Sequence, residues 1–262
     1  MPKSRVAAAL GPANYCSIPL ALGGDATRQF YFRKDTSDEA IIKQILVEHH
    51  YDLRRLQRSP ELAEFVERRQ DMTGKRPLVI DAGANIGASA IFFATSIPGA
   101  VVVAVEPNRE NFDLLKKNVE SLDVEPINAA ISSTPGWARV VDPGISHWGY
   151  RTENLAEGAT ARDSVPRLTI EDLFRQHAEL CFPFIVKIDI EGGEADLFSG
   201  ATAWVEHTPI LIIELHDWLL PKGGSSRPFL RCISRLDRDF LYSAEDVYSI
   251  ANDLDAIALP ST

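Results

Sequence analysis

The sequence predicts an α/β fold built on a doubly wound, mostly parallel sheet. Short apolar runs alternate along the chain with segments of helical periodicity. Strands that are apolar along their whole length are buried on both faces, which is typical of parallel sheets covered by helices. A glycine-bearing turn follows the first such run directly, at the position where open α/β sheets bind ligands. With 262 residues and 45% hydrophobic content, the chain can bury a sizeable core.

The first part of the chain, residues 1–75, is predicted to be a partly helical N-terminal extension that packs on the remainder. Residues 29–33 have the composition of a short strand. Thr36 and Glu39 have the spacing of a capping box, in which two side chains satisfy free amides at a helix start. Helical periodicity follows, and a second helix is expected over 60–69.

Residues 76–262 are predicted to form the principal domain. Strands and the first two helices are expected at 78–80, 88–96, 101–105, 111–122, 127–131, 184–188 and 209–215. Residues 132–182 interrupt this alternation with glycines, prolines and strand-like pieces, and we expect them to form an insert or lid beside the site. A helix and two closing strands are expected between 231 and 260.

The composition narrows the classes of function and location. The formal net charge of −10 disfavours nucleic-acid binding, because phosphate backbones are anionic. No apolar run approaches the roughly 18 residues of a membrane span, and no signal-peptide pattern is apparent, so a cytoplasmic location is expected. The three cysteines are widely spaced and predict neither a disulfide framework nor a zinc site. Nothing in the sequence specifies an oligomeric state.

The turn over 81–87, Asp-Ala-Gly-Ala-Asn-Ile-Gly, is the first candidate for a cofactor site. Gly83 permits a tight turn, and Gly87 lets the helix start approach the strand closely. The amides at the helix start then face the crevice at the carboxyl ends of the strands. Asn85 stands where a dinucleotide-binding motif carries glycine, so that motif is matched only loosely. A tight connection without any ligand stays open as an alternative.

Carboxylates follow three of the later strands. Glu106 ends the second strand some twenty residues after the turn, where an acidic residue can accept hydrogen bonds from both ribose hydroxyls. Asp189 and Glu191 follow the fourth strand, where carboxylates can face a sulfonium or act as a base, although helix capping would also explain them. Glu214 and His216 end the fifth strand, and alternation places them on the same side unless the strand ends before His216. A structural role for His216 stays open.

Four motifs, in order and spacing, resemble those of the FkbM-type methyltransferases: Asp81-x-Gly83-x-Asn85-x-Gly87, Val105-Glu106-Pro107-Asn108, Asn128-Ala129-Ala130 and Lys187-Ile188-Asp189-Ile190-Glu191-Gly192-x-Glu194. Asn85 is a feature of that family's turn, so the departure from the dinucleotide motif supports the resemblance. The resemblance covers roughly residues 76–216. It implies the class I methyltransferase fold, whose seven-stranded sheet has one antiparallel strand near the edge. It also implies S-adenosylmethionine as methyl donor and a hydroxyl of a small molecule or saccharide as acceptor.

The resemblance also implies roles for individual residues. Asp81 and Gly83 should lie near the methionine part of the cofactor, Glu106 should bind the ribose, and residues 128–130 should border the adenine. The full set of expected cofactor-binding residues is Asp81, Gly83, Asn85, Gly87, Glu106, Asn108, Ala129, Ala130 and Asp189. The candidates for a catalytic base are His216, Asp189, Glu191 and His147, the last within the predicted insert.

The same residues also allow three other interpretations. Asp189, Glu191 and Glu214 could hold a divalent cation, but no wider ligand cluster accompanies them, so the sequence predicts a site without metal. An NAD-dependent oxidoreductase on the related dinucleotide fold is opposed by Asn85 and by the Asp-Ile-Glu-Gly element. A non-catalytic cofactor-binding protein could share the fold, although the intact Glu106 argues for a working site.

Overall fold

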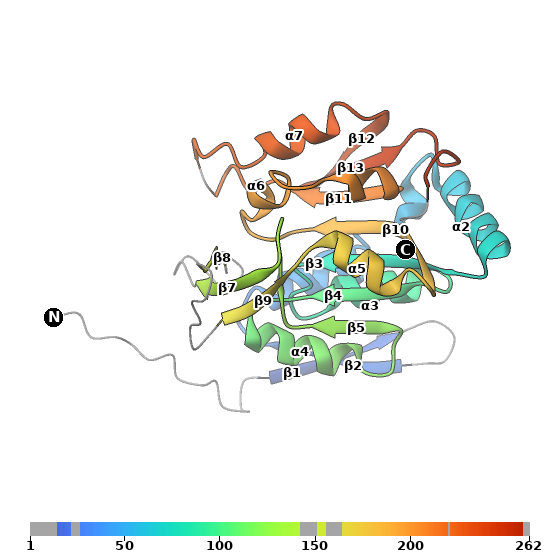
Figure 1. Cartoon of the computed structure of the whole chain (residues 1–262). Helices are drawn as coiled ribbons and strands as arrows, with labels where there is room; N and C mark the ends of the chain where they lie inside the picture. The colour runs from blue at the N-terminus through green and yellow to red at the C-terminus, as the bar shows by residue number, and fades with distance from the viewer. Residues whose placement is uncertain (1–14, 22–26, 142–150, 156–163, 220, 259–262) are drawn as a thin grey trace.

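The protein's fold centres on one large sheet of seven strands. The computed structural model describes residues 15–21, 27–141, 151–155, 164–219 and 221–258 (Figure 1). The strands of the sheet are β3 (Arg76–Ala82), β4 (Val101–Val105), β5 (Val124–Ile127), β10 (Cys181–Ile188), β11 (Ile210–Glu214), β12 (Arg238–Ser243) and β13 (Asp246–Ala251). Their order is β12-β13-β11-β10-β3-β4-β5. β13 runs antiparallel to both of its neighbours and the other pairs are parallel, which confirms the predicted seven-stranded, mostly parallel sheet.

Side chains of the central strands alternate between two hydrophobic clusters, one on each face of the sheet. In β3, Val79 packs in the first cluster, whereas Leu78 and Ile80 pack in the second. The first cluster is covered by α2 (Ser59–Thr73), α3 (Ala88–Ser96) and α4 (Arg109–Val119). The second is covered by α5 (Ile170–His177), α6 (Glu194–Leu197), η4 (Ala203–His207) and α7 (Arg227–Ile233). The main sheet is therefore buried on both faces, as its apolar strands predict.

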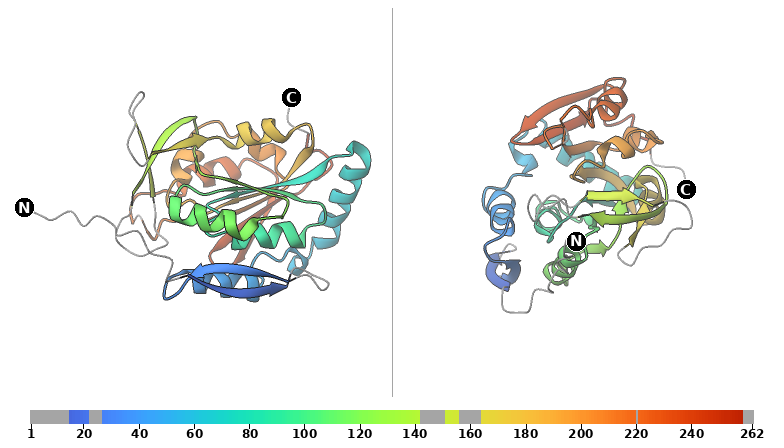
Figure 2. Two further views of the ribbon diagram at one scale, coloured as in Figure 1. Left: turned by 90° about the horizontal axis from the view of Figure 1, so that it is seen from below. Right: turned by 90° about the vertical axis from the view of Figure 1, so that its left-hand side faces the viewer.

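The N-terminal extension begins, within the described residues, with a hairpin that the sequence did not predict. β1 (Tyr15–Ala21) pairs antiparallel with β2 (Thr27–Arg33), and β2 contains the predicted strand over 29–33. The hairpin lies beside α4 (Figure 2). Asn118 of α4 joins them, because its Oδ1 accepts from the Tyr31 amide at 2.7 Å and its Nδ2 donates to the Tyr31 carbonyl at 2.9 Å. The same Nδ2 donates to the carbonyl of Ile86 in the glycine turn at 2.8 Å.

Asn118→Ala is therefore expected to loosen the extension from the principal domain. Asn118 is fully buried, and the change leaves three backbone groups without their partner. Each such group costs about 1–3 kcal/mol when no water replaces the bond, and partial hydration of the hairpin edge should limit the loss to about 2 kcal/mol. Urea denaturation followed by circular dichroism measures it. A decrease below about 0.5 kcal/mol, the range of ordinary surface substitutions, would contradict this anchoring role.

The helix after β2 starts differently from the predicted capping box. α1 (Asp38–Ile41) begins at Asp38, and Thr36 Oγ1 accepts from the Asp38 amide at 3.2 Å while donating to the Arg33 carbonyl at 2.8 Å. Glu39 is exposed and does not complete the reciprocal cap. Instead Asp38 is buried and pairs with Arg33 at 2.8 Å. The chain continues through the π-helix η2 (Ile42–Val47) and the 3-10 turn η3 (Leu53–Arg55) to α2.

A second, smaller sheet lies at the carboxyl ends of the main strands (Figure 1). It is ordered β6-β9-β7-β8 and consists of β6 (Ala130–Ile131), β7 (Gly136–Val141), β8 (Arg151–Asn154) and β9 (Ser164–Leu168). The predicted insert of 132–182 is therefore shorter than expected, since α5 buries Leu173 and Phe174 in the main core. The predicted strand over 127–131 is also divided. β5 ends at Ile127 in the main sheet, and β6 opens the small one.

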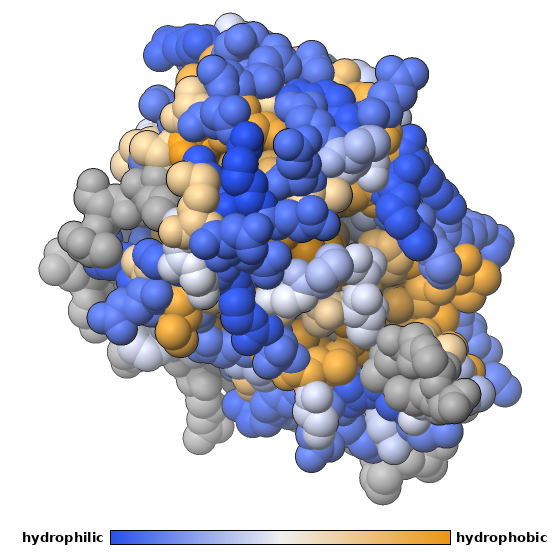
Figure 3. Space-filling view, turned by 90° about the vertical axis from the view of Figure 1, so that its right-hand side faces the viewer, coloured by the Kyte–Doolittle hydropathy of each residue, from blue (hydrophilic) through white to orange (hydrophobic). Residues whose placement is uncertain are grey.

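The face of the molecule at the amino ends of the parallel strands carries fewer of the predicted functional groups than the face at their carboxyl ends. Polar side chains cover most of this face, with apolar patches between them (Figure 3). A cleft of about 690 Å³, including its open mouth, lies here and has an apolar wall that includes Leu62, Val66 and Ile97. The predicted carboxylates and glycines lie at the other end of the strands. Within the described residues, no helix is both long and apolar enough to cross a membrane.

Candidate active site

The glycine turn after β3 brings the chain against the end of β10. Gly83 has φ +80°, and a Cβ at this position would lie 1.8 Å from the Asp189 carbonyl oxygen. Asn85 has φ +49°, a left-handed conformation that asparagine tolerates better than most residues. Gly87 also has a positive φ, but a Cβ there would meet the side chain of Leu115 at 2.8 Å. Gly87 therefore lets α3 approach α4, whereas the sequence predicted a close approach to the strand.

Glu106 connects the end of β4 to this turn. Its side chain is buried, with Oε2 accepting from the Asn85 amide at 2.9 Å and Oε1 accepting from the Asn108 amide at 2.9 Å. Burial raises the pKa of Glu106 to about 7, although the amides of Asn108 and Asn85 act in the opposite direction. Each carboxylate oxygen has two lone pairs, so Glu106 can accept further hydrogen bonds from a ligand beside it.

A cleft of about 540 Å³, including its open mouth, runs along the carboxyl ends of β3, β4 and β10, and we call it the first cleft. Its lining includes Gly83, Asn85, Val105, Glu106, Pro107, Asn111, Ala130, Ile131, Thr152, Asp189, Ile190 and Glu191. Asn85 Oδ1 is buried here and lacks a hydrogen-bond partner within the described residues. An unsatisfied oxygen, a strand-end carboxylate and aliphatic side chains together fit the hydroxyls and the flat base of a nucleoside.

A buried lysine connects β10 to the glycine turn. Lys187 in β10 donates from Nζ to the Gly83 carbonyl at 2.8 Å and forms ion pairs with Asp81 at 3.2 Å and Asp189 at 3.5 Å. Burial alone would lower the pKa of Lys187, but these two carboxylates raise it above its ordinary value. Asp81 also accepts from Ser89 Oγ at 2.6 Å. Asp81 is fully buried and does not line the cleft, so it supports the turn from below.

A second cleft, of about 700 Å³ including its open mouth, lies on the other side of the turn. The N-terminal extension supplies one wall, through residues such as Gln44 and Tyr51. The opposite wall comes from the strand ends and the C-terminal part of the chain, including Glu214, Trp218, Glu245 and Asp246. The two clefts share Gly83, Asn85, Asp189 and Glu191, so they meet at these four residues.

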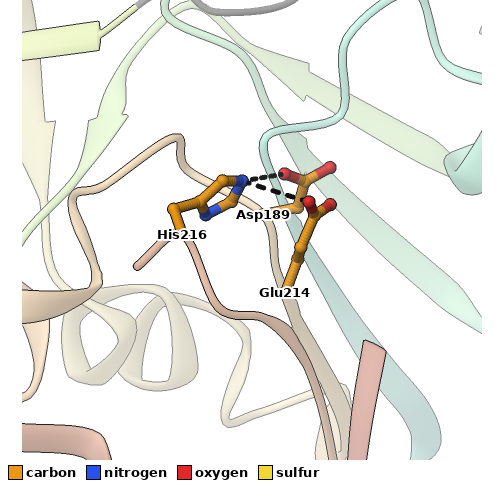
Figure 4. Close-up of side chains that lie close together, drawn as sticks. All are labelled: Asp189, Glu214 and His216. Carbon is orange, nitrogen blue, oxygen red and sulfur yellow. Dashed lines mark ion pairs between the residues drawn. The ribbon is translucent and has the colours of Figure 1, made fainter. Parts of the chain in front are cut away.

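His216 lies behind the second cleft and is surrounded by carboxylates (Figure 4). Its Nδ1 is 2.8 Å from Glu194 Oε1, and its Nε2 is 3.4 Å from Glu214 Oε1, 3.5 Å from Glu191 Oε2 and 3.6 Å from Asp189 Oδ1. Burial alone would lower the pKa of His216, but the bond to Glu194 and the charges of the other carboxylates raise it to about 9. Burial raises the pKa of Glu191 to about 7 and that of Glu214 to about 8.

The structure separates the predicted site residues into two groups. Those that line one or both clefts are Gly83, Asn85, Glu106, Ala130, Asp189 and Glu191. Those that lie behind the cleft walls are Asp81, Gly87, Asn108, Ala129 and His216. Asn108, for example, caps α4 by accepting from the amides of Glu110 and Asn111. His147 falls outside the described residues.

Three contributors to the site were assigned no role from the sequence, although Lys187 begins the fourth motif. Lys187 is a charged residue within an otherwise apolar strand, and this contrast was a usable signal. Tyr51 is buried in the second cleft, and burial raises the pKa of its hydroxyl well above the ordinary value. Asp246 lines the same cleft and pairs with His50 at 2.6 Å. No local pattern marks Tyr51 or Asp246, because they reach the site through contacts between distant parts of the chain.

Comparison with known proteins adds independent information. A family model described as the methyltransferase FkbM domain matches residues 81–244. The hexuronic acid methyltransferase AglP of Haloferax volcanii is 30% identical over 166 residues, which cover 61% of this chain and 66% of AglP, just under two thirds of it. Methyltransferase sdnD of Sordaria araneosa is 21% identical over 202 residues, covering 65% of this chain and 71% of sdnD. A solved O-methyltransferase from Bacillus cereus in complex with SAH aligns at 12% identity with a TM-score of 0.37, covering 83% of this chain and 98% of that chain.

Proposed function

Because this chain belongs to the FkbM family of methyltransferases, we propose that it transfers a methyl group from S-adenosylmethionine to a hydroxyl of a saccharide or another small molecule. S-adenosylmethionine is the cofactor of this family. The observation that carries the proposal is the meeting of two clefts at Gly83, Asn85, Asp189 and Glu191. One cleft fits a nucleoside, and the other leaves room for an acceptor beside it. Methyl transfer needs this adjacency, since donor and acceptor must be aligned.

The first cleft is the proposed cofactor site. Bound there, S-adenosylmethionine supplies a methyl group that is activated by its attachment to a sulfonium. Glu106 accepts hydrogen bonds from the ribose hydroxyls, and Ala130 with Ile131 packs against the base. Asp189 and Glu191 border the methyl group, because they lie where the first cleft meets the second. Asp81 and Lys187 act indirectly by holding the turn against β10.

The second cleft is the proposed acceptor site. It combines the exposed Trp218 with Gln44, Tyr51 and several carboxylates. An aromatic face can pack against the C–H surface of a sugar ring, while carboxylates and amides accept hydrogen bonds from its hydroxyls. The relative AglP is named for methylation of a hexuronic acid, which also favours a saccharide acceptor. Glu191 is the proposed acceptor of the hydroxyl proton, and its position at the border of both clefts supports this role.

A ligand comparison tests the cofactor assignment against the nicotinamide alternative. S-adenosylhomocysteine should raise the melting temperature of the purified protein, whereas NAD at the same concentration should not. A ligand at 100 times its Kd stabilises the folded state by about 2.7 kcal/mol, which is readily measured. Stabilisation by NAD alone would overturn the proposal. Methyl transfer to a panel of simple saccharides, followed by mass spectrometry, then tests the acceptor class.

The affinity for S-adenosylhomocysteine is expected to rise with pH through about 7. Ribose hydroxyls donate to the charged form of Glu106, whose pKa in the ligand-free protein is about 7. Between pH 6 and pH 8 the ionised fraction rises from about 0.09 to about 0.91, so the affinity should increase roughly tenfold. Isothermal titration calorimetry at both pH values measures the change. Glu106→Gln is the control, and it should bind more weakly and with a shallower rise, because the titration of Glu106 is removed while that of Glu191, whose pKa is also about 7, remains. An equally steep rise in the variant would contradict the assignment.

A further inference from the structure

We propose that Asp189, Glu214 and His216 bind a divalent metal cation at the inner wall of the second cleft. One ligand atom from each residue lies within 4.8 Å of the others. Figure 4 shows the imidazole of His216 pointing at the two carboxylates. The sequence alone predicted a site without metal, because no ligand cluster accompanied the carboxylates of Asp189, Glu191 and Glu214. The proposal is independent of which acceptor the protein uses.

The distances around His216 Nε2 suit a coordination shell better than hydrogen bonds. Three carboxylate oxygens lie 3.4–3.6 Å from this nitrogen, whereas charge-assisted hydrogen bonds are about 2.7–2.9 Å long. One ring proton also cannot satisfy three oxygens. Ligand atoms bound to one ion at about 2.0–2.2 Å, with angles of about 90–109°, are separated by about 2.9–3.6 Å. The separations from Nε2 to Glu214 and Asp189, 3.4 and 3.6 Å, fall within this range.

The ring of His216 is fixed in the way that metal-binding histidines usually are. Its side chain is only 1% exposed, and its Nδ1 donates to Glu194 at 2.8 Å. Metal-ligating histidines commonly donate their second ring nitrogen to a carboxylate, which sets the ring orientation. This contact leaves Nε2 aimed into the cluster, where it has no hydrogen bond of ordinary length within the described residues. A buried imidazole held in this way supports a metal site independently of the acidic side chains.

Charge and access also favour a cation. Four carboxylates surround His216, and the nearby Lys187 is shared between Asp81 and Asp189. An ion would offset this negative charge and would displace the proton on Nε2. Asp189 is 29% exposed, Glu214 is 18% exposed, and both line the second cleft, so an ion can enter from solvent. One imidazole and two carboxylates suit first-row ions such as Mn²⁺ or Zn²⁺ better than Ca²⁺.

Titration of the whole chain with Mn²⁺ tests the proposal. Protein stripped with a chelator is titrated with MnCl₂, and free Mn²⁺ is measured by electron paramagnetic resonance. One equivalent should bind per chain. Asp189→Asn and Glu214→Gln should each weaken binding at least tenfold, because each removes a charged ligand. Glu245→Gln is the matched control; it removes an acidic group from the same cleft that is not among the ligands, and binding should persist.

Several results of this titration would overturn the proposed metal site. Failure of the stripped protein to bind Mn²⁺ overturns the proposal, as does binding that both ligand variants retain. Equal losses in Glu214→Gln and Glu245→Gln would show that general acidity attracts the ion, which also overturns it. His216→Gln is examined together with its thermal unfolding, since the change is buried. If it folds and still binds Mn²⁺ like the unaltered chain, histidine is not a ligand.

Discussion

Gly83→Ala is expected to weaken S-adenosylhomocysteine binding at least about 100-fold, which corresponds to about 2.7 kcal/mol. The added Cβ would lie 1.8 Å from the Asp189 carbonyl oxygen and 2.9 Å from its carbonyl carbon. Both are backbone atoms, so a side-chain rotation cannot relieve the clash. Either the turn or the end of β10 must move by more than 1 Å, and both border the two clefts. Calorimetric titration measures the loss.

Gly74→Ala provides the control for backbone strain. Gly74 ends α2 with φ +68°, similar to the φ of +80° at Gly83, but a Cβ there meets nothing within 4 Å. The left-handed conformation alone costs about 1–2 kcal/mol for a residue with a Cβ. Gly74→Ala should therefore lower the stability by this amount and leave binding unchanged. Similar binding losses in both variants would show that strain, rather than the approach to Asp189, limits the affinity.

The main sheet could be predicted because its strands are buried on both faces. Residues 78–80, 101–105 and 184–188 all fall within observed parallel strands, and the helix expected at 88–96 has the observed bounds. A continuous apolar run carries this information locally. The hairpin strand Tyr15–Ala21 could not be found in this way, because it lies outside the main sheet and has only one partly buried face.

The division of the predicted strand over 127–131 shows where local patterns fail. The run is mostly apolar, but Asn128 lies within it. Its Nδ2 donates to the carbonyls of Glu106 at 2.9 Å and Pro107 at 3.0 Å. These bonds hold the chain at the end of β4, and the following residues enter the small sheet. The polar residue marks the break, but only the folded structure supplies the partners that cause it.

The candidate site was predictable to the extent that topology determines it. Carboxyl ends of parallel strands meet at one edge, so strand-end residues such as Glu106 and Asp189 were expected to converge. Burial was not predictable to the same degree. Asp81 ends its strand as those residues do, yet it is enclosed beneath the turn because Lys187 and Ser89 cover it. The pairing of a strand lysine with that aspartate joins residues more than 100 positions apart.

Lys187→Met is expected to lower the free energy of unfolding by about 3–5 kcal/mol, the usual cost of removing one partner from a buried ion pair. Asp81 is fully buried, so its charge would be left without a compensating cation. Asp189 would suffer less, because it is 29% exposed and can be hydrated. Urea denaturation followed by circular dichroism measures the change. A loss below about 1 kcal/mol would show that the pair contributes little.

The double variant Lys187→Met with Asp81→Asn separates stability from the shape of the site. Neutralising Asp81 removes the unpaired charge, and the amide oxygen can still accept from Ser89, so much of the lost stability should return. Cofactor affinity should not return with it. Lys187 also donates to the Gly83 carbonyl, and methionine cannot replace this bond, so the turn lacks this connection to β10 in both variants. Recovered stability with persistently weak S-adenosylhomocysteine binding would assign Lys187 to positioning the turn, whereas recovery of both would reduce its role to charge balance.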